Sequence, residues 1–426
     1  MRLIRFPMMF FLIAGIFILA QVIDEEFQVN TYTLNGQYDP AIARDKDGNI
    51  IFAWTSDKQD GDITGVYARI FLESGQAKTQ EFRVNNITDH FQTKPQIAIA
   101  DSGSFAVVWI SYKVMQGANI AARLFDPNGN PLGNEFIVNT FNEGYQGEPD
   151  IAMDTQGNFV IVWQSWDQDG DGFGIFARKY SREGNPQGSP FQVNKTAVDD
   201  QMHPSVAMDG EGNFSVVWTS FGQDDRLTGI FAQRISRLNE FLGPEFQVNI
   251  TTQGWQDWPD IAMDRWGNFI ICWHDIRFTA DDYDIYARTF DKTAAIKGPE
   301  FRVNTYTQNR QMYPSIAADP QGNFTVCWQS ENQDGEDFGI YARIFDLYAR
   351  PQGSEFLINT IRDKSQEFPA VAMTSLQALS FVWTGYEKNG TDTNIYARTY
   401  GEQPAHPALP LRLPPKRKEP IKKWKN

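Results

Sequence analysis

The chain has 426 residues, 14% of them aromatic, and its formal net charge is −15. This aromatic content supplies enough apolar surface for a large core, which excludes global disorder. The acidic balance also argues against a nucleic-acid partner, because such binding depends on the neutralisation of phosphates. Cations, neutral polymers and basic proteins are the partner classes that this charge favours.

Residues 1–20 have the pattern of a signal peptide. Arg2 and Arg5 precede an apolar run from Phe6 to Ala20, and Ala20 is a small residue at the expected cleavage point. The run is shorter than the roughly 20 residues that a membrane span requires. We therefore expect a secreted, periplasmic or cell-surface protein with no transmembrane segment after signal cleavage. The alternative is that this segment stays uncleaved and anchors the chain.

Residues 21–401 are expected to form a single domain, because they contain one repeat of about 55 residues seven times. Each copy has the string Glu-Phe-x-Val-Asn or a close variant, then a Gln three residues before a Pro, and then a Trp. The Phe of the string stands at positions 27, 82, 136, 191, 246, 301 and 356. The Trp stands at positions 54, 109, 163, 218, 273, 328 and 383.

Each repeat is predicted to form four short strands. In the third copy these are residues 149–154, 159–163, 175–180 and 190–194, separated by turns rich in Gly, Asn and Asp. Residues 159–163 are apolar at every position, which is typical of a sheet that is covered on both faces.

Seven units of four strands predict an all-β fold, a seven-bladed β-propeller with four-stranded antiparallel blades. The seventh repeat stops after its third strand, residues 394–400, and the missing fourth strand is found at Glu26 to Asn30. We therefore expect the ring to be closed by the N-terminal strand, which removes two exposed sheet edges. The alternative is an open β-solenoid, in which this permutation has no purpose.

The full pattern is Glu-Phe-x-Val-Asn, Gln-x-x-Pro-x-Ile/Val-Ala, Gly-Asn-Phe-x-Val-Val-Trp and Ile/Val-Tyr/Phe-Ala-Arg-x-Phe/Tyr, over residues 26–400. It resembles the propeller-type repeats of bacterial secreted and cell-surface proteins. The resemblance implies a propeller fold, often beside calcium-binding or adhesion-type modules, and implies no particular chemistry. The second repeat lacks the acidic loop and the seventh lacks the Gly-Asn turn, which argues against a function spread evenly over all repeats.

The residue directly before the repeat Pro differs strongly between copies. In a propeller it is expected at the mouth of the central channel, on the face where the ligand-binding loops gather. Repeats one to four supply charged or titratable groups and repeats five to seven supply aromatic rings: Asp39, Lys94, Glu148, His203, Trp258, Tyr313 and Phe368. Aromatic faces beside carboxylates suit sugars, so we predict a glycan or protein ligand here. The alternative is a set of variable loop residues without a ligand.

The loop between the second and third strands is acidic in several repeats. In the third repeat, the spacing of Asp167, Asp169 and Asp171 is typical of the start of a calcium loop, so Ca²⁺ is the candidate cofactor. The loop lacks the later Glu of an EF-hand, and a solvated turn is the alternative.

We predict a non-enzymatic binding or scaffold protein. The alternative is a secreted hydrolase or lyase acting on polysaccharide, with His274 and Asp275 as catalytic residues and His203 facing them from the neighbouring repeat. The sequence has no His or Cys cluster with metal-ligand spacing and no nucleophile motif that supports this alternative.

Other recurrent residues are predicted to be structural. The in-phase Gln and Asn, such as Gln146 and Asn139, are expected to hold backbone groups. The Arg after Tyr-Ala or Phe-Ala, such as Arg178, is expected to pair with a carboxylate. Cys272 and Cys327 are one repeat apart, which is too far for a disulfide, so we expect both to be buried and free.

Residues 402–426 are Pro-rich and then basic, with seven Lys or Arg residues against two acidic ones. We predict a disordered tail whose positive charge can touch anionic surfaces. Simple solvation of the tail is the alternative. Because these positive charges lie outside the repeats, the repeat region is more acidic than the whole chain.

Overall fold

The computed structural model describes residues 25–113, 117–224, 227–276, 283–376, 378–387 and 392–400. The predicted signal peptide, residues 1–20, and the predicted tail, residues 402–426, lie outside the described residues. The described part of the chain is built from strands and turns, and it contains no helix with the length and apolar character that a bilayer crossing requires.

The strands group in fours. Repeats one to six each supply one inner, one second, one third and one short outer strand, and the seventh supplies the first three, with β1 beside its third strand. The inner strands are β2 (Gln37–Arg44), β6 (Phe91–Ile99), β10 (Gln146–Met153), β14 (Gln201–Met208), β18 (Trp255–Met263), β22 (Gln311–Ala318) and β26 (Gln366–Ser375). The second strands are β3 (Ile50–Asp57), β7 (Phe105–Lys113), β11 (Phe159–Trp166), β15 (Phe214–Asp224), β19 (Phe269–Ile276), β23 (Phe324–Glu331) and β27 (Ala378–Tyr386).

The third strands are β4 (Thr64–Phe71), β8 (Gly117–Phe125), β12 (Phe173–Tyr180), β16 (Leu227–Ile235), β20 (Tyr283–Phe290), β24 (Phe338–Phe345) and β28 (Thr393–Tyr400). The outer strands are β1 (Phe27–Gln28), β5 (Phe82–Arg83), β9 (Phe136–Ile137), β13 (Phe191–Gln192), β17 (Phe246–Gln247), β21 (Phe301–Arg302) and β25 (Phe356–Leu357).

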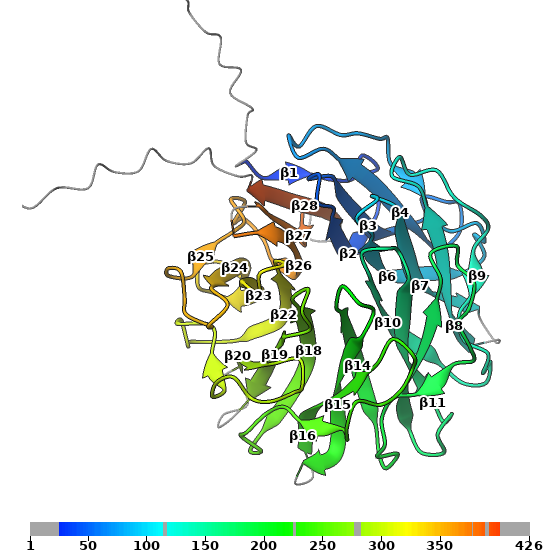
Figure 1. Ribbon diagram of the computed structural model, residues 1–426. Helices are drawn as coiled ribbons and strands as arrows, with labels where there is room; N and C mark the ends of the chain where they lie inside the picture. The colour runs from blue at the N-terminus through cyan, green and yellow to red at the C-terminus, as the bar shows by residue number, and fades with distance from the viewer. Residues whose placement is uncertain are drawn as a thin grey trace, which may run out of the picture.

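The sheets are set radially around a common centre (Figure 1). Neighbouring strands within each group of four are antiparallel, and one parallel bridge between Thr64 and Phe91 joins the first two groups into an eight-stranded sheet. The N-terminal strand β1 lies beside β28, with Phe27 opposite Ala397. The prediction of an all-β, propeller-type fold is confirmed.

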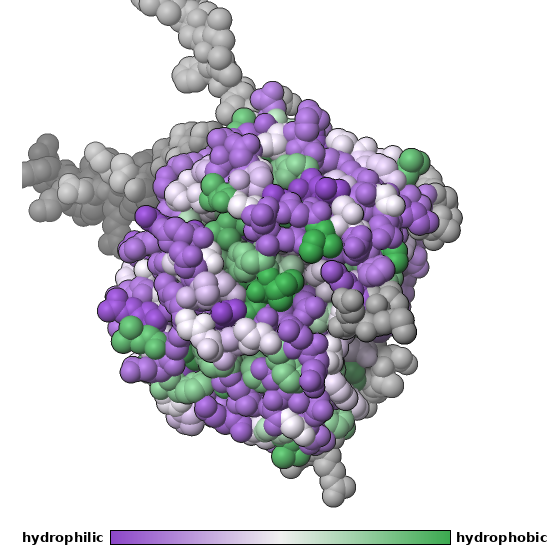
Figure 2. Space-filling view, turned by 90° about the vertical axis from the view of Figure 1, so that its right-hand side faces the viewer, coloured by the Kyte–Doolittle hydropathy of each residue, from purple (hydrophilic) through white to green (hydrophobic). Residues whose placement is uncertain are grey.

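The core lies between neighbouring sheets. One cluster, for example, joins Val108 of the second repeat to Ile161 and Trp163 of the third. Both faces of each second strand are buried, as the apolar run at residues 159–163 predicts. The rim is different: the side of the molecule that carries β8 and β9 is mostly hydrophilic, with hydrophobic residues only in small groups (Figure 2).

The recurrent amides hold backbone groups, as predicted, and the Gln also binds the indole of the repeat Trp. Gln146 Nε2 donates to the carbonyl of Glu143 (3.1 Å), and its Oε1 accepts from the indole N–H of Trp163 (3.2 Å). Asn139 Oδ1 accepts from the backbone N–H of Ile120 (2.9 Å). These contacts satisfy polar groups that the sheets would otherwise bury unpaired.

The predicted carboxylate partner of the recurrent Arg is wrong. Arg178 Nη1 donates to the backbone carbonyl of Val138 at 2.9 Å, across the boundary to the preceding repeat. Arg288 and Arg343 make the same contact in their repeats, at 2.7 and 2.8 Å. The short outer strand leaves this carbonyl without a ladder partner, and the guanidinium supplies the donor. Cys272 and Cys327 are buried and free, as predicted.

Candidate functional site

The seven residues before the repeat Pro come together, one from each inner strand, around a cavity of about 490 Å³. We call them the mouth ring: Asp39, Lys94, Glu148, His203, Trp258, Tyr313 and Phe368. All seven have left-handed backbone, with φ from 45° to 52°, although none is glycine. Each lies where the register of its inner strand shifts, a bulge that turns the side chain into the channel.

The preceding repeat fixes the backbone of several mouth-ring residues. The N–H of His203 donates to Gln164 Oε1, and the N–H of Phe368 donates to Gln329 Oε1, both at 3.0 Å. Each acceptor is the residue directly after a repeat Trp. The backbone of these ring residues is therefore held in place by contacts that do not depend on their own side chains.

Aromatic rings form one half of the mouth ring. His203 stacks on Trp258 with centroids 3.9 Å apart and an interplanar angle of 16°. The ring centroids of Trp258 and Tyr313 are 5.2 Å apart, and those of Tyr313 and Phe368 are 5.0 Å apart. The four rings form a continuous row, and Phe368 is still 39% exposed.

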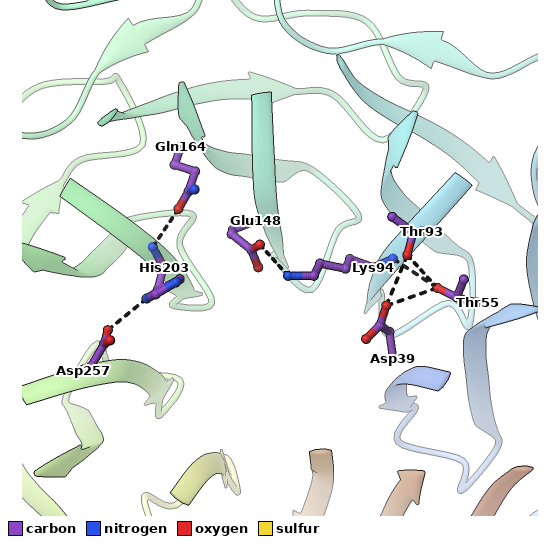
Figure 3. A network of polar contacts seen from close by, with 8 residues as sticks. All are labelled: Asp39, Thr55, Thr93, Lys94, Glu148, Gln164, His203 and Asp257. Atoms are coloured by element: carbon purple, nitrogen blue, oxygen red, sulfur yellow. Dashed lines mark hydrogen bonds and ion pairs between the residues drawn. The ribbon is translucent and has the colours of Figure 1, made fainter. Parts of the chain in front are cut away.

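Charged groups form the other half (Figure 3). Lys94 Nζ pairs with Glu148 Oε1 at 2.5 Å and lies 5.9 Å from the Trp258 ring, which joins the two halves. Burial alone would lower the pKa of Lys94, and the Glu148 carboxylate raises it above its usual value. Asp39 Oδ2 accepts from Thr93 Oγ1 at 3.2 Å, and burial raises the pKa of this carboxyl.

Two further carboxyls, Asp150 and Asp260, line the cavity two residues beyond the mouth ring along their inner strands. Ser205 Oγ lies 3.0 Å from Asp150 Oδ2 and 2.8 Å from Asp260 Oδ1. A serine hydroxyl donates only one proton, so both contacts are hydrogen bonds only when one carboxyl is protonated. Burial and then the nearby Asp260 raise the pKa of Asp150 to about 7, and burial raises the pKa of Asp260.

Of the three residues in the predicted catalytic alternative, only His203 lines the cavity. His203 Nδ1 lies 2.9 Å from Asp257 Oδ1, and Figure 3 shows the two side chains pointing toward each other. Burial would raise the pKa of Asp257, and its contact with His203 lowers it.

His274 and Asp275 are buried on β19 and serve other groups. His274 Nδ1 accepts from the backbone N–H of Tyr313 at 3.4 Å, so it stands where repeats three and six use Gln. Burial lowers the pKa of His274 to about 4, which keeps the imidazole neutral. Asp275 Oδ1 accepts from Gln256 Nε2 at 3.0 Å. His274 therefore positions the mouth ring from beneath it.

The acidic loop of the third repeat does not gather its carboxylates. Asp169 Oδ2 accepts from the amides of Gln192 (3.0 Å) and Asn194 (3.2 Å), and Asp171 Oδ2 accepts from a backbone N–H (3.2 Å). Within the described ranges, no three His, Cys, Asp or Glu residues are arranged to hold a metal ion. This geometry gives no support to the predicted Ca²⁺ site at Asp167, Asp169 and Asp171.

Asp150 and Ser205, which line the cavity, and Asp257, which contacts His203, were not predicted from the sequence. A signal was present for the first two, because the position after the repeat Pro carries Asp or Ser in repeats three to six and Ala or Gln elsewhere. No such signal exists for Asp257, because its equivalents in the other repeats are Tyr, Thr, Gly, Met, Met and Glu.

No protein-family model matches the sequence, and no curated protein matches it. Among solved structures, polysaccharide lyase Uly1 is similar with a TM-score of 0.57 and 8% identity, over 89% of this chain and 100% of that one. A protein of unknown function from Dyadobacter fermentans DSM 18053 has a TM-score of 0.51 and 9% identity, over 88% and 98%.

The β-propeller domain of the Trilobed protease from Pyrococcus furiosus is similar with a TM-score of 0.50 and 8% identity, over 86% of this chain and 94% of that one. At such low identity these likenesses show the fold alone. The fold and the cavity together define a propeller-type protein with a ring of unlike side chains at its channel mouth.

Proposed function

We propose that this chain is a closed, seven-bladed propeller that binds carbohydrate at its channel mouth. The observation that carries the proposal is the row of rings from His203 to Phe368, together with the Lys94–Glu148 ion pair, whose Lys94 Nζ lies 5.9 Å from the Trp258 ring. Sugars pack their C–H faces on aromatic rings while charged groups bind their hydroxyls. The cavity volume of about 490 Å³ lies within the roughly 300–1,000 Å³ of small-molecule sites.

Contacts of the N-terminal strand support ring closure. Glu26 Oε2 accepts from Thr360 Oγ1 at 2.6 Å, as Glu245 Oε1 accepts from Thr196 Oγ1 at 2.8 Å inside the repeat array. Asn30 Oδ1 accepts from the N–H of Ile395 at 2.8 Å, which is the contact that Asn139 makes in its own repeat. The start of the chain thus replaces the fourth strand that the seventh repeat lacks.

Hydrolysis or lysis of a polysaccharide is the second candidate function, and the Asp150–Ser205–Asp260 group favours it. A carboxyl with a pKa of about 7 keeps its proton near neutral pH, which is the state that a general acid needs. The His203–Asp257 pair supplies a base on the same cavity. Likeness to a polysaccharide lyase adds only an analogy of fold.

A glycan array with two tryptophan variants tests the binding proposal. We expect Trp258→Ala to lower the affinity for any bound glycan at least tenfold. Trp266→Ala is the matched control, because Trp266 is 49% exposed in the turn at the other end of its sheet. If Trp258→Ala and Tyr313→Ala bind every detected glycan as tightly as the unchanged protein, the mouth is not the site.

Incubation with polysaccharides separates binding from catalysis. A binding protein leaves the chain length of the polymer unchanged, as measured by released reducing ends and by ultraviolet absorbance of unsaturated products. If the unchanged protein shortens a polymer and Asp260→Ser does not, the second candidate replaces the first. Serine is the residue that repeats four and six carry at this position, so this variant retains a side chain that the fold accepts.

We also propose that residues 1–20 direct export and that residues 402–426 form a basic tail. The charged start and apolar run of residues 1–20 support the first proposal, and the seven Lys or Arg of the tail support the second. N-terminal sequencing of the exported protein tests cleavage after Ala20. Binding of acidic lipid vesicles with and without residues 402–426 tests the tail.

A further inference from the structure

A second group of aromatic residues lies at the mouth end of the third repeat, outside the mouth ring. This outer aromatic cluster consists of Tyr145, Trp166 and Phe173, from β10, β11 and β12 or directly beside them. Tyr145 is 37% and Trp166 is 45% exposed. No other repeat carries three aromatic residues at these positions. The other repeats form the same sheet without them, so the fold does not require these three rings.

Ring contacts and a backbone hydrogen bond hold the cluster together. The ring centroid of Phe173 lies 4.9 Å from that of Trp166 and 6.1 Å from that of Tyr145, with interplanar angles of 75° and 83°. The backbone N–H of Trp166 donates to the carbonyl of Tyr145 at 2.9 Å. Rings that are held by packing and by strand ends lose little entropy when a ligand binds.

Tyr145 connects the cluster to the mouth ring. Its side chain lies over Gly147, where a Cβ atom would stand 2.7 Å from Tyr145 Cζ and 2.8 Å from its hydroxyl oxygen. The other repeats carry a side chain at this position: Tyr38, Thr93, Met202, Asp257, Met312 and Glu367. Only the third repeat therefore lets an aromatic ring fold toward the channel. Burial and then the carboxylate of Glu148, a mouth-ring residue, raise the pKa of Tyr145.

Carboxylates lie on the Phe173 side of the outer aromatic cluster. Asp200 Oδ1 accepts from the N–H of Phe173 at 2.9 Å, and Asp171 Oδ2 accepts from the N–H of Asp199 at 3.2 Å. Carboxylates accept hydrogen bonds from hydroxyl and ammonium groups and repel other carboxylates. The charge of the surroundings favours neutral or amino sugars over uronic acids.

We propose that the outer aromatic cluster is a second sugar subsite, continuous with the mouth ring, so that the protein binds a chain of several neutral or amino sugars. The proposal rests on the proposed function, because the mouth is one end of the binding path. The ligand runs from the channel over Tyr145 to Trp166, across the third repeat. The length of this path distinguishes recognition of a polymer from recognition of a single sugar.

Calorimetry with oligosaccharides of two lengths tests the proposal. The probes are the disaccharides and hexasaccharides of the cello-, xylo- and chito- series, with hexagalacturonate as the anionic probe. We expect Trp166→Ala to lower the affinity for the best hexasaccharide at least tenfold and to change the affinity for its disaccharide less than twofold. Trp258→Ala lowers both affinities, and Trp266→Ala changes neither.

Two further variants test the arrangement of the rings. Trp166→Phe keeps a ring and recovers most of the affinity that Trp166→Ala loses. Gly147→Ala displaces Tyr145 and lowers the hexasaccharide affinity, with a melting temperature that shows the variant is folded. Gly147 does not have a positive φ, so alanine meets no backbone strain there.

The outcomes separate the outer subsite from the mouth. Equal hexasaccharide affinity in Trp166→Ala and the unchanged protein, with a loss in Trp258→Ala, overturns the outer subsite and leaves the mouth. A loss in Trp166→Ala without one in Trp258→Ala overturns the mouth and leaves the cluster as an isolated site. No binding of any probe overturns both proposals, and tighter binding of hexagalacturonate overturns the charge argument.

Discussion

The repeats carry the same residues in the interior of the sheets and different residues at the mouth ring. Inside the sheets the repeats are alike, because every repeat Trp, such as Trp163 or Trp218, is completely buried between two sheets. At the mouth, residues as different as Lys94 and Trp258 occupy the same backbone conformation. The difference teaches that contacts from the preceding repeat hold the backbone of the ring, so the same backbone accepts very different side chains, which can vary to fit a ligand.

The mouth ring itself has two different halves, one aromatic and one charged. Its aromatic half comes from consecutive repeats, so its rings contact one another in a row. Its charged half pairs Lys94 with Glu148 and leaves few charges unopposed. A ligand that fits this ring therefore needs an apolar face on one side and hydroxyl groups on the other.

The largest expected effect comes from removing an interior contact that only the chain start supplies. Deletion of residues 26–30 should lower the free energy of unfolding by roughly 4–6 kcal/mol, because it exposes the pocket of Val29 and leaves backbone groups of β28 unpaired. Chemical denaturation of a chain that lacks residues 402–426 is the control, with an expected change below about 0.5 kcal/mol. Equal losses in both proteins would contradict closure by β1.

The next largest effect concerns how the stability depends on pH. Two buried groups, Asp150 and His274, change it in opposite directions. The pKa of Asp150, raised to about 7, makes stability fall as pH rises from about 4 to 7, because the folded state keeps a proton that the unfolded state loses. The pKa of His274, lowered to about 4, makes stability rise as pH rises from about 4 to 6.5, because only the unfolded state then binds a proton. The two slopes oppose each other in the unchanged protein.

Two variants taken from other repeats change one slope each: His274→Gln removes the titrating imidazole, and Asp260→Ser weakens the Asp150 slope, although burial still raises the pKa of Asp150. His274→Gln copies repeats three and six, and its stability should fall from pH 4 to pH 7 by roughly 1–3 kcal/mol more than that of the unchanged protein. Asp260→Ser lowers the pKa of Asp150, and its stability should rise with pH over this range relative to the unchanged protein. Denaturation curves at several pH values measure both, and parallel profiles for the three proteins would refute the assignment.

The smallest effect concerns the backbone of the mouth ring. Phe368 has a φ of 52°, which glycine adopts without strain and alanine does not. Phe368→Gly should therefore be more stable than Phe368→Ala by about 1 kcal/mol, the reverse of the usual order in a strand. At Ile151, which has no positive φ, the glycine variant should be the less stable of the pair. The same order at both positions would show that the ring backbone is not held from outside.

Much of the fold and the positions of the mouth ring could be predicted from the sequence. Four anchors that recur in phase fix the strands, since side chains alternate along a strand with a period of two. The residue before each Pro was predicted at the channel, and all seven line it. The partners of the recurrent Arg were predicted incorrectly, because a free backbone carbonyl leaves no mark in a sequence.

The sequence by itself determined the repeat, its four strands and its four recurrent anchors, which are the Glu-Phe-x-Val-Asn string, the Gln, the Pro and the Trp. All of these depend on spacing within about 55 residues. Only the tertiary structure decided which residues of different repeats meet: Asp150 with Asp260 through Ser205, and His203 with Asp257. These contacts depend on how far each sheet is turned from the next around the axis. That angle comes from the packing of whole sheets, and no local pattern of residues records it.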